Sequence, residues 1–582
     1  MSTHEAQFQP VCKVSDLPEG HARSVRLDGL HIAVFNDKNA YRAVDNRCPH
    51  MGYPLVKGTI RDGILICHWH HWEFDLKSGA CFAGGGDDVK TFPVRVIDGQ
   101  VCVATTGHDD QARALRQRGL KVLQQGLKEG STFMTAKAVA ALQTAGAEFD
   151  EIISHGLLYG VQKSNGGWSG GLAVLTIAGN MWREVDEDDR NLFLVHGLSR
   201  ISGQRSSRPP QGPFPGNEEQ ELDTLKRWFR RFIEQRNLTG AERVLLTLHG
   251  RGHGREVLGD FIFTAATDYY YTGKGHALDF GNKTLEALDY VEDADAGHLL
   301  RPIVVDLATR IRHEEDAQWS EAVPVLEEIF GHIDAIWDDN QQNQAELDIS
   351  TFTEALLVDD FRASVKDVED RLRAGCSPQS LCRALTYAGA RRMARFHLKN
   401  EGDWHAVANL YSYAHALYRA FEISPSAELL RGIFHGAVVC THLRWLNMPA
   451  ARIPRRDETT EETLSGPVEI LERLQQYADF QKVYEAELVA NQYLSEGHDV
   501  AVLRRRLTHI LLQEDAELHM FQVLEVACRH YDLSNDPEER RQHMLAAVRY
   551  IIAQKVMRGI LWATRNAEML ERGELLSERD DD

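Results

Sequence analysis

Two short groups of cysteine and histidine lie close together near the start of the sequence. Cys48 and His50 form a Cys-x-His box, and after 16 intervening residues Cys67 and His70 form a Cys-x-x-His box. Two thiolates and two imidazoles can hold a [2Fe–2S] cluster, with the cysteines on one iron and the histidines on the other. The same donor set can also hold a single zinc ion. The residue types therefore predict a metal centre and leave iron and zinc as alternatives.

The residues that flank the two boxes favour iron. Residues 51–55 read Met-Gly-Tyr-Pro-Leu, and residues 72–75 read Trp-Glu-Phe-Asp, with a glycine at position 79. Residues 92–103 contain an Asp-Gly pair, which is typical of a tight hairpin turn. In these features residues 9–106 resemble the Rieske ferredoxin-like family. Zinc fingers and ribbons space their ligands differently and lack such flanking residues.

The resemblance implies a small all-β domain and a set of cluster ligands, namely Cys48, His50, Cys67 and His70. The second box departs from the family pattern, because His68 stands where proline is common and His71 stands where glycine is common. By position His70 is the ligand, and we expect His68 and His71 to be neighbours of the cluster.

The resemblance also indicates the type of Rieske protein. Rieske subunits of respiratory complexes carry an additional cysteine in each box, and these positions are Tyr53 and Trp69 here. The sequence is therefore similar to the soluble, lower-potential ferredoxin type.

Composition excludes several classes of protein. The chain has 582 residues, of which 43% are hydrophobic and 26% charged, with a formal net charge of −21. This is the composition of a folded protein, and so acidic a chain is poorly suited to sequence-independent nucleic-acid binding. No apolar run is long enough to span a membrane, and the N-terminus has no export signal. With only nine cysteines, we expect a cytoplasmic protein.

The sequence changes character near residue 108. Before it, short runs rich in Val, Ile and aromatic residues predict strands, and after about residue 110 helical spacing of apolar residues predicts helices. The predicted fold is a small all-β domain followed by a large all-α region, with repeated helical units as one interpretation. The predicted division is a Rieske domain at 1–108, a helical unit with a Gly-rich turn at 109–203, a Pro-rich linker at 204–222, helical units at 223–345 and 346–447, a linker at 448–467 and a helical unit at 468–582.

Four segments of the helical region look alike, at residues 166–178, 275–288, 403–417 and 517–527. Each opens with a polar or aromatic pair and continues into an amphipathic helix. Their spacing is a little over 100 residues, which is longer than common solenoid repeats. We interpret them as up to four divergent helical units.

The middle two segments align at a constant offset of 129 residues. This offset pairs His276 with His405, Asp268 with His397, Glu286 with His415, Asp306 with His435 and His313 with His442. Positions that can bind a metal in both copies could line one shared cavity suited to iron. The candidate ligands of a second iron are His276, Asp306, His313, His397, His405, His435 and His442, and the candidate catalytic residues are His276, His405, Glu286 and Asp268.

Two considerations argue against this alignment. The chain has 26 histidines, so some coincidences arise at any offset. In addition, Asp306 and His313, like His435 and His442, are seven residues apart. That spacing places them on one helix face but about 10 Å apart along its axis, too far to bind one ion together.

A Rieske cluster performs no bond chemistry itself. The rest of the chain must therefore accept, supply or use the electrons that the cluster carries, or position the cluster. Catalytic subunits of Rieske oxygenases typically carry an Asp-x-x-His-x-x-x-x-His run, which is missing from this sequence. No convincing dinucleotide fingerprint is present either, so we expect a separate NAD(P)H-dependent reductase or ferredoxin to supply electrons.

We expect an oxidoreductase in which the cluster relays single electrons to a second, non-heme iron site in the helical region. There O₂ would be activated on a small organic substrate in a mono- or dioxygenase-like reaction. The alternative is a non-catalytic electron carrier or redox sensor whose helical region docks partner proteins. A third reading keeps the enzyme but replaces the second iron by an organic cofactor. If the two centres lie in different subunits, a homo-oligomer is required, and we expect no nucleic-acid or membrane partner.

Overall fold

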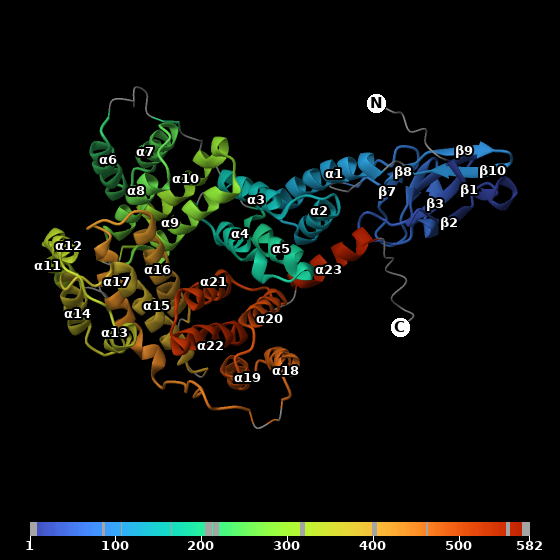
Figure 1. Ribbon diagram of the computed structural model, residues 1–582. Coiled ribbons are helices and arrows are strands. Elements are labelled where there is room, and N and C mark those ends of the chain that lie inside the picture. The colour runs from blue at the N-terminus through green and yellow to red at the C-terminus, as the bar shows by residue number, and fades with distance from the viewer. Residues whose placement is uncertain are drawn as a thin grey trace. The chain divides into compact units, whose positions relative to one another are not determined.

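The computed structural model describes residues 8–83, 88–105, 108–163, 166–203, 212–213, 220–312, 314, 321–398, 404–460, 462, 464–554 and 559–572. These residues form two compact units (Figure 1). The first comprises the described residues up to Ile152 together with Gly559–Arg572, and the second begins at Ile153. The predicted fold class, a small all-β domain followed by a large all-α region, is confirmed. The finer division into helical units and linkers stays a prediction, and most of the linker at 204–222 lies outside the described residues.

The strands of the first unit form three small antiparallel sheets, which together make the β domain (residues 8–105). The sheets are β1 (Phe8–Lys13), β10 (Gln100–Ala104) and β9 (Val94–Ile97); β2 (Ala22–Leu27), β3 (Leu30–Asp37), β4 (Ala40–Asp45) and β8 (Thr91–Phe92); and β5 (Thr59–Arg61), β6 (Ile64–Ile66) and β7 (Glu73–Asp75). The predicted hairpin turn joins β9 to β10. Its residues Asp98 and Gly99 have φ of 48° and 75°, as a tight two-residue turn requires.

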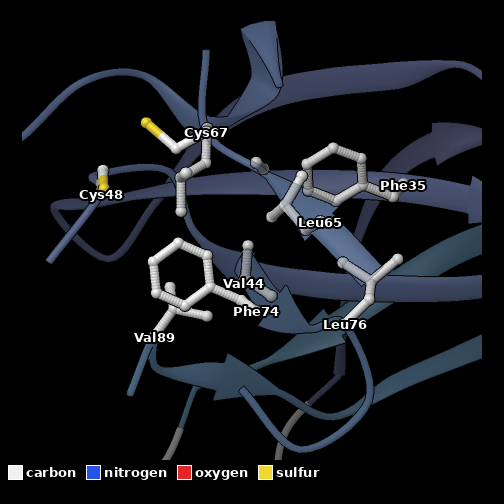
Figure 2. Close-up of a cluster of buried hydrophobic side chains, with 10 residues drawn as sticks. Phe35, Val44, Cys48, Leu65, Cys67, Phe74, Leu76 and Val89 are labelled. Atoms are coloured by element: carbon white, nitrogen blue, oxygen red, sulfur yellow. The ribbon is translucent and has the colours of Figure 1, made fainter. Parts of the chain in front are cut away.

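Strand β3 separates two apolar cores of the β domain. Because successive side chains of a strand point to opposite faces, Ala33 and Phe35 pack into one core, while Ile32 and Val34 pack into the other. Figure 2 shows the first core, which contains Phe35, Val44, Leu65, Phe74, Leu76 and Val89. The sulfur atoms of Cys48 and Cys67 lie at one end of this core. The packing of β3 thus provides a rigid base for both cysteine boxes.

Three helices complete the first unit, namely α1 (His108–Glu129), α2 (Thr132–Thr144) and α23 (Gly559–Arg572). Helix α2 packs against both α1 and α23. Ser131 begins α2 as an N-cap, because its side chain accepts a hydrogen bond of 3.3 Å from the N–H of Met134. The residues from Thr135 to Leu142 are all buried, so α2 is the central helix of this group.

The second unit is helical throughout its described residues. Its helices are α3 (Phe149–Lys163, which begins in the first unit), α4 (Gly170–Met181), α5 (Arg190–Ile201), α6 (Leu222–Glu234), α7 (Leu238–Gly250), α8 (Arg255–Thr267), α9 (His276–Ala287), α10 (Asp293–Thr309), α11 (Val323–Phe330), α12 (Ile333–Gln342), α13 (Ile349–Leu356), α14 (Phe361–Arg373), α15 (Pro378–Ala394), α16 (Trp404–Ile423), α17 (Leu430–His442), α18 (Pro467–Asp479), α19 (Val483–Ser495), α20 (Val500–Leu512), α21 (Leu518–Leu533) and α22 (Pro537–Ala553).

Four of these helices pack around the centre of the second unit. They are α4, α9, α16 and α21, which arise from the four segments that look alike in the sequence. Helix α9 contacts α4 and α16, and α21 contacts the same two helices, so the four form a ring (Figure 1). Helices α4 and α9 are buried on nearly every face, as expected of helices that other helices surround. The interpretation as four related units stays a prediction.

No helix within the described part of the chain combines the length and the apolar character that a bilayer crossing requires.

Candidate metal centre

The two cysteine boxes form loops with the same backbone hydrogen-bond pattern. In the first loop (residues 48–53) the N–H of Cys48 donates to the carbonyl five residues later, over 2.9 Å, and the N–H four residues later donates to the Cys48 carbonyl, over 2.8 Å. In the second loop (residues 67–72) the same two bonds are made by Cys67, at 2.9 and 3.1 Å. Each loop therefore turns back on its own cysteine and presents that cysteine and the following histidine together.

The thiols of Cys48 and Cys67 lie next to each other and form a hydrogen bond. A hydrogen bond from Cys48 and the backbone N–H groups of Trp69 and His70 lower the pKa of Cys67 to about 6, although burial opposes this. The bond to Cys67 and burial raise the pKa of Cys48 above its usual value. The N–H groups of the loops thus favour thiolates, and a bound cation would favour ionisation of both sulfurs.

The two imidazoles also meet. The ring centroids of His50 and His70 lie 4.5 Å apart, with an interplanar angle of 78°. Trp72 stacks on His50 at a centroid distance of 4.4 Å and fixes the plane of that ring. Burial, together with the nearby charges of His70 and Lys137, lowers the pKa of His50. His50 is therefore neutral at physiological pH, the form in which an imidazole binds metal.

Comparison with known proteins identifies this part of the chain. The family model of the Rieske [2Fe–2S] domain matches residues 7–93. The 3-phenylpropionate/cinnamic acid dioxygenase ferredoxin subunit of Photorhabdus laumondii is 35% identical over 98 residues, which cover 16% of this chain and 92% of that protein. The chain belongs to the Rieske family. The helical region matches no family model.

Two further similarities are confined to the same Rieske domain. Apoptosis-inducing factor 3 of Mus musculus is 37% identical over 83 residues, which cover 14% of this chain and only 12% of that protein. The solved structure of the Sphingomonas yanoikuyae B1 ferredoxin is 28% identical and covers 17% of this chain and 100% of its own, with a TM-score of 0.17.

A Rieske domain implies a [2Fe–2S] cluster, and the side chains present here fit that group. The pairs Cys48 with Cys67 and His50 with His70 each converge, as a cluster with two cysteines on one iron and two histidines on the other requires. Nδ1 of His50 is buried and has no hydrogen-bond partner among the described residues. A buried imidazole nitrogen without a partner is costly unless it binds something, which is consistent with a ligand role.

The backbone conformation at position 71 explains why a histidine can stand where glycine is common. The fourth residue after each cysteine adopts a left-handed conformation, with φ of 78° at Gly52 and 57° at His71. At Gly52 a side chain is also excluded by space, because a Cβ would lie 2.2 Å from Cδ2 of Leu570. His71 is exposed, and histidine is among the few non-glycine residues enriched in this conformation. The exposed His68 forms a 2.6 Å hydrogen bond with the Thr59 hydroxyl, as suits a neighbour of the cluster.

Two of the candidates in the helical region are brought together by a third histidine. His276, His405 and His519 lie at the starts of α9, α16 and α21, and we call them the three-histidine cluster. The ring of His519 lies 5.5 Å from that of His276 and 4.6 Å from that of His405. His405 Nδ1 hydrogen bonds to the Tyr550 hydroxyl at 3.1 Å, and His519 Nε2 bonds to Oδ1 of Asn409 at 2.7 Å.

His519 was not among the predicted site residues. The segment at 517–527 contains it, but the constant offset of 129 residues relates only the middle two segments, and His405 and His519 are 114 residues apart. A signal was nevertheless present in the sequence. His519 lies near the start of the fourth segment, as His276 and His405 lie near the starts of the second and third segments. Burial and the charges of His276 and His405 lower the pKa of His519 to about 3. His519 is therefore neutral at physiological pH.

Glu286 lies deeper among the central helices and has a positive partner. Its carboxylate accepts hydrogen bonds from Lys283 at 2.7 Å and from the Asn180 amide at 2.8 Å. Lys283 also donates to Glu525 at 2.6 Å, so one ammonium group bridges two buried carboxylates. Burial would raise the pKa of Glu286, but Lys283 and the nearby His415 outweigh it and lower the pKa to about 2. His415 lies near Glu286, and the positive partner of Glu286 is Lys283. A metal-binding role for Glu286 and His415 stays a prediction.

The two candidate aspartates are held by arginines. Asp268 accepts hydrogen bonds from Arg230 at 2.6 and 2.9 Å, and it forms a 2.9 Å ion pair with Arg431. Asp306 is fully buried and paired with Arg310. Burial raises the pKa of Asp306 to about 6, although Arg310 opposes the shift.

The remaining candidate histidines are dispersed. His435 and His442 pack against aromatic rings at centroid distances of 5.4 Å, and His397 is half-buried after the end of α15. His313 lies outside the described residues. As the side chains stand, no three metal-ligating groups among the described residues could hold a single ion. The second iron site therefore stays a prediction, and the three-histidine cluster is the place where its candidates meet.

The backbone at His71 yields a test of loop geometry. We expect His71→Gly to leave the thermal stability of the Rieske domain unchanged or raised. We expect His71→Val to cost about 1–3 kcal/mol, because a β-branched residue tolerates positive φ poorly. Visible circular dichroism of the iron-loaded protein during heating measures both. His68→Val, in the same loop, is the matched control. Equal stability of the two His71 variants would contradict the proposed strain.

The Lys283 bridge yields a second test. Lys283→Met leaves Glu286 and Glu525 buried without a counter-charge, so we expect the free energy of unfolding of the helical unit to fall by about 3–5 kcal/mol. Chemical denaturation followed by far-UV circular dichroism measures this. Since the pKa of Glu286 is lowered to about 2, its contribution is present above its ordinary pKa and is lost as the pH falls towards 2.

The control for Lys283 is Lys366, an exposed lysine that also pairs with carboxylates. We expect Lys366→Met to have a much smaller effect. Equal effects of the two substitutions would contradict the role assigned to Lys283.

Proposed function

We propose that this protein is an oxidoreductase in which a Rieske cluster passes single electrons to an acceptor in the helical unit. The ligands are Cys48 and Cys67 for one iron and His50 and His70 for the other. The observation that carries this proposal is the convergence of these four side chains from two loops of the same shape. When bound, the cluster supplies reversible one-electron transfer.

The residues of the loops hold these four donors in place. Backbone N–H groups of both loops donate to the sulfur atoms, which favours thiolate ligands. Asn46 anchors the first loop, because its Oδ1 accepts a 2.8 Å hydrogen bond from the N–H of Val56. His70 and Trp69 are exposed, Trp69 by 44%, so electrons can enter or leave on the His70 side. The similarity to a dioxygenase ferredoxin subunit supports an electron-carrying role.

For the acceptor, we propose a non-heme iron at the three-histidine cluster. The ring centroids there are 4.6 and 5.5 Å apart, close to the 4.5 Å between His50 and His70, which we assign to one iron. Neutral imidazoles suit iron, and iron can activate O₂ on a small organic substrate. Binding would require His405 to rotate away from Tyr550 and His519 to rotate away from Asn409. Electrons would come from a separate NAD(P)H-dependent reductase or ferredoxin.

One observation favours a second candidate function. Nδ1 of His405 and Nε2 of His519 each form a hydrogen bond with a protein group, the Tyr550 hydroxyl and the Asn409 amide oxygen. A helical unit built in this way also suits an electron carrier or redox sensor whose helical unit docks a partner.

The cluster assignment is tested by metal analysis and EPR. Anaerobically purified protein should contain about two irons in the Rieske domain and show a Rieske-type signal after dithionite reduction. Cys48→Ser and Cys67→Ser should abolish the signal, because each removes a ligand, whereas His68→Ala should retain it as the matched control. Zinc in place of iron, or a signal that survives loss of either cysteine, would contradict the assignment.

The proposed iron site at the three-histidine cluster is tested by measuring iron in excess of the two irons of the Rieske cluster. If the helical unit binds iron, an excess should persist in Cys48→Ser and disappear in His405→Ala and His519→Ala, because those rings are its proposed ligands. His498→Ala, which removes a histidine far from α9 and α16 in sequence, is the control. About two irons in the wild type, unaffected by His405→Ala and His519→Ala, would contradict a second iron and favour the carrier.

A further inference from the structure

A buried lysine from outside the matched Rieske segment reaches the first loop. Lys137 of α2 is only 6% exposed, and its Nζ donates a hydrogen bond to the carbonyl of Pro49. Pro49 lies between the proposed ligands Cys48 and His50, and the charge of Lys137 acts on His50. Lysine is seldom buried to this extent unless an interaction compensates the loss of hydration.

Charged side chains of both signs surround the first loop. Arg47 pairs with Asp45 through hydrogen bonds of 2.7 and 2.9 Å and also donates to the Leu570 carbonyl. Glu571 of α23 is the second acid of this group, and Arg118 of α1 acts on it together with Arg47 and Lys137. Burial raises the pKa of Glu571, although Arg118, Arg47 and Lys137 oppose this shift.

We propose that Lys137 is a positioning residue that raises the reduction potential of the Rieske cluster. Reduction adds one negative charge to the cluster, and a nearby buried cation stabilises the reduced form more than the oxidised form. The Pro49 hydrogen bond holds this cation at a fixed place beside the ligands. This inference rests on the proposed function, since it requires the cluster.

Lys137 lies outside the segment that the Rieske family model matches. The family model ends at residue 93, whereas Lys137 lies on α2, which packs against the C-terminal helix α23. The helices that follow the Rieske domain would thus set its potential and, with it, the direction of electron flow.

The experiment is a dye-mediated redox titration of the full-length protein, with the midpoint read from the Rieske EPR signal. We expect Lys137→Met to lower the midpoint potential by about 59 mV, which corresponds to tenfold in the equilibrium constant for one electron. Lys137→Arg should restore a potential near that of the wild type, because it keeps the charge. Lys121→Met, which removes an exposed lysine of α1 in the same unit, should cause a much smaller shift.

The outcomes separate this inference from the function on which it rests. The EPR signal reports only molecules that hold the cluster, so partial loss of cluster in Lys137→Met does not obscure the potential. If the wild type has no Rieske signal, the proposed function fails. If the signal is present but Lys137→Met shifts the potential no more than Lys121→Met, only the role of Lys137 is overturned. An equal decrease in Lys137→Met and Lys137→Arg would also overturn it, because charge would not be the cause.

Discussion

The Rieske domain depends on a geometric constraint, because four donor side chains from two loops must meet at the end of one packed core. The loops satisfy it by turning back on Cys48 and Cys67 through the same pair of backbone hydrogen bonds. That turn needs a left-handed residue at Gly52 and at His71. The core beneath keeps the two loops at a fixed separation, because Phe35, Leu65 and their neighbours are fully buried. Backbone geometry and packing thus position the four donors.

The second compact unit has a different constraint, because polar groups lie among its closely packed central helices. Near the starts of three of these helices lie His276, His405 and His519. At a deeper level Lys283 compensates the charges of Glu286 and Glu525. Buried charges are tolerated when they are paired and hydrogen-bonded. The paired charges of Lys283, Glu286 and Glu525 are therefore explained by stability. The three-histidine cluster is the better candidate for chemistry.

Much of the Rieske domain could be predicted from sequence, because its chemistry is encoded locally. Each box supplies its own cysteine and histidine within four residues, and the Asp98-Gly99 turn is a two-residue signal. The helical sites could not be predicted in the same way. His519 comes from a segment whose spacing differs from the constant offset. Lys283 lies only three residues before Glu286, but its second partner, Glu525, is 242 residues away along the chain. Lys137 contacts a residue 88 positions away, a relation that only the packing of α2 reveals.

The most direct test of the central claim is pulsed ENDOR on the dithionite-reduced protein labelled with ¹⁵N-histidine. If His50 and His70 hold one iron of the cluster, two histidine nitrogens should couple strongly to the electron spin. A reduced protein whose signal shows no strongly coupled histidine nitrogen would contradict the assignment of both imidazoles.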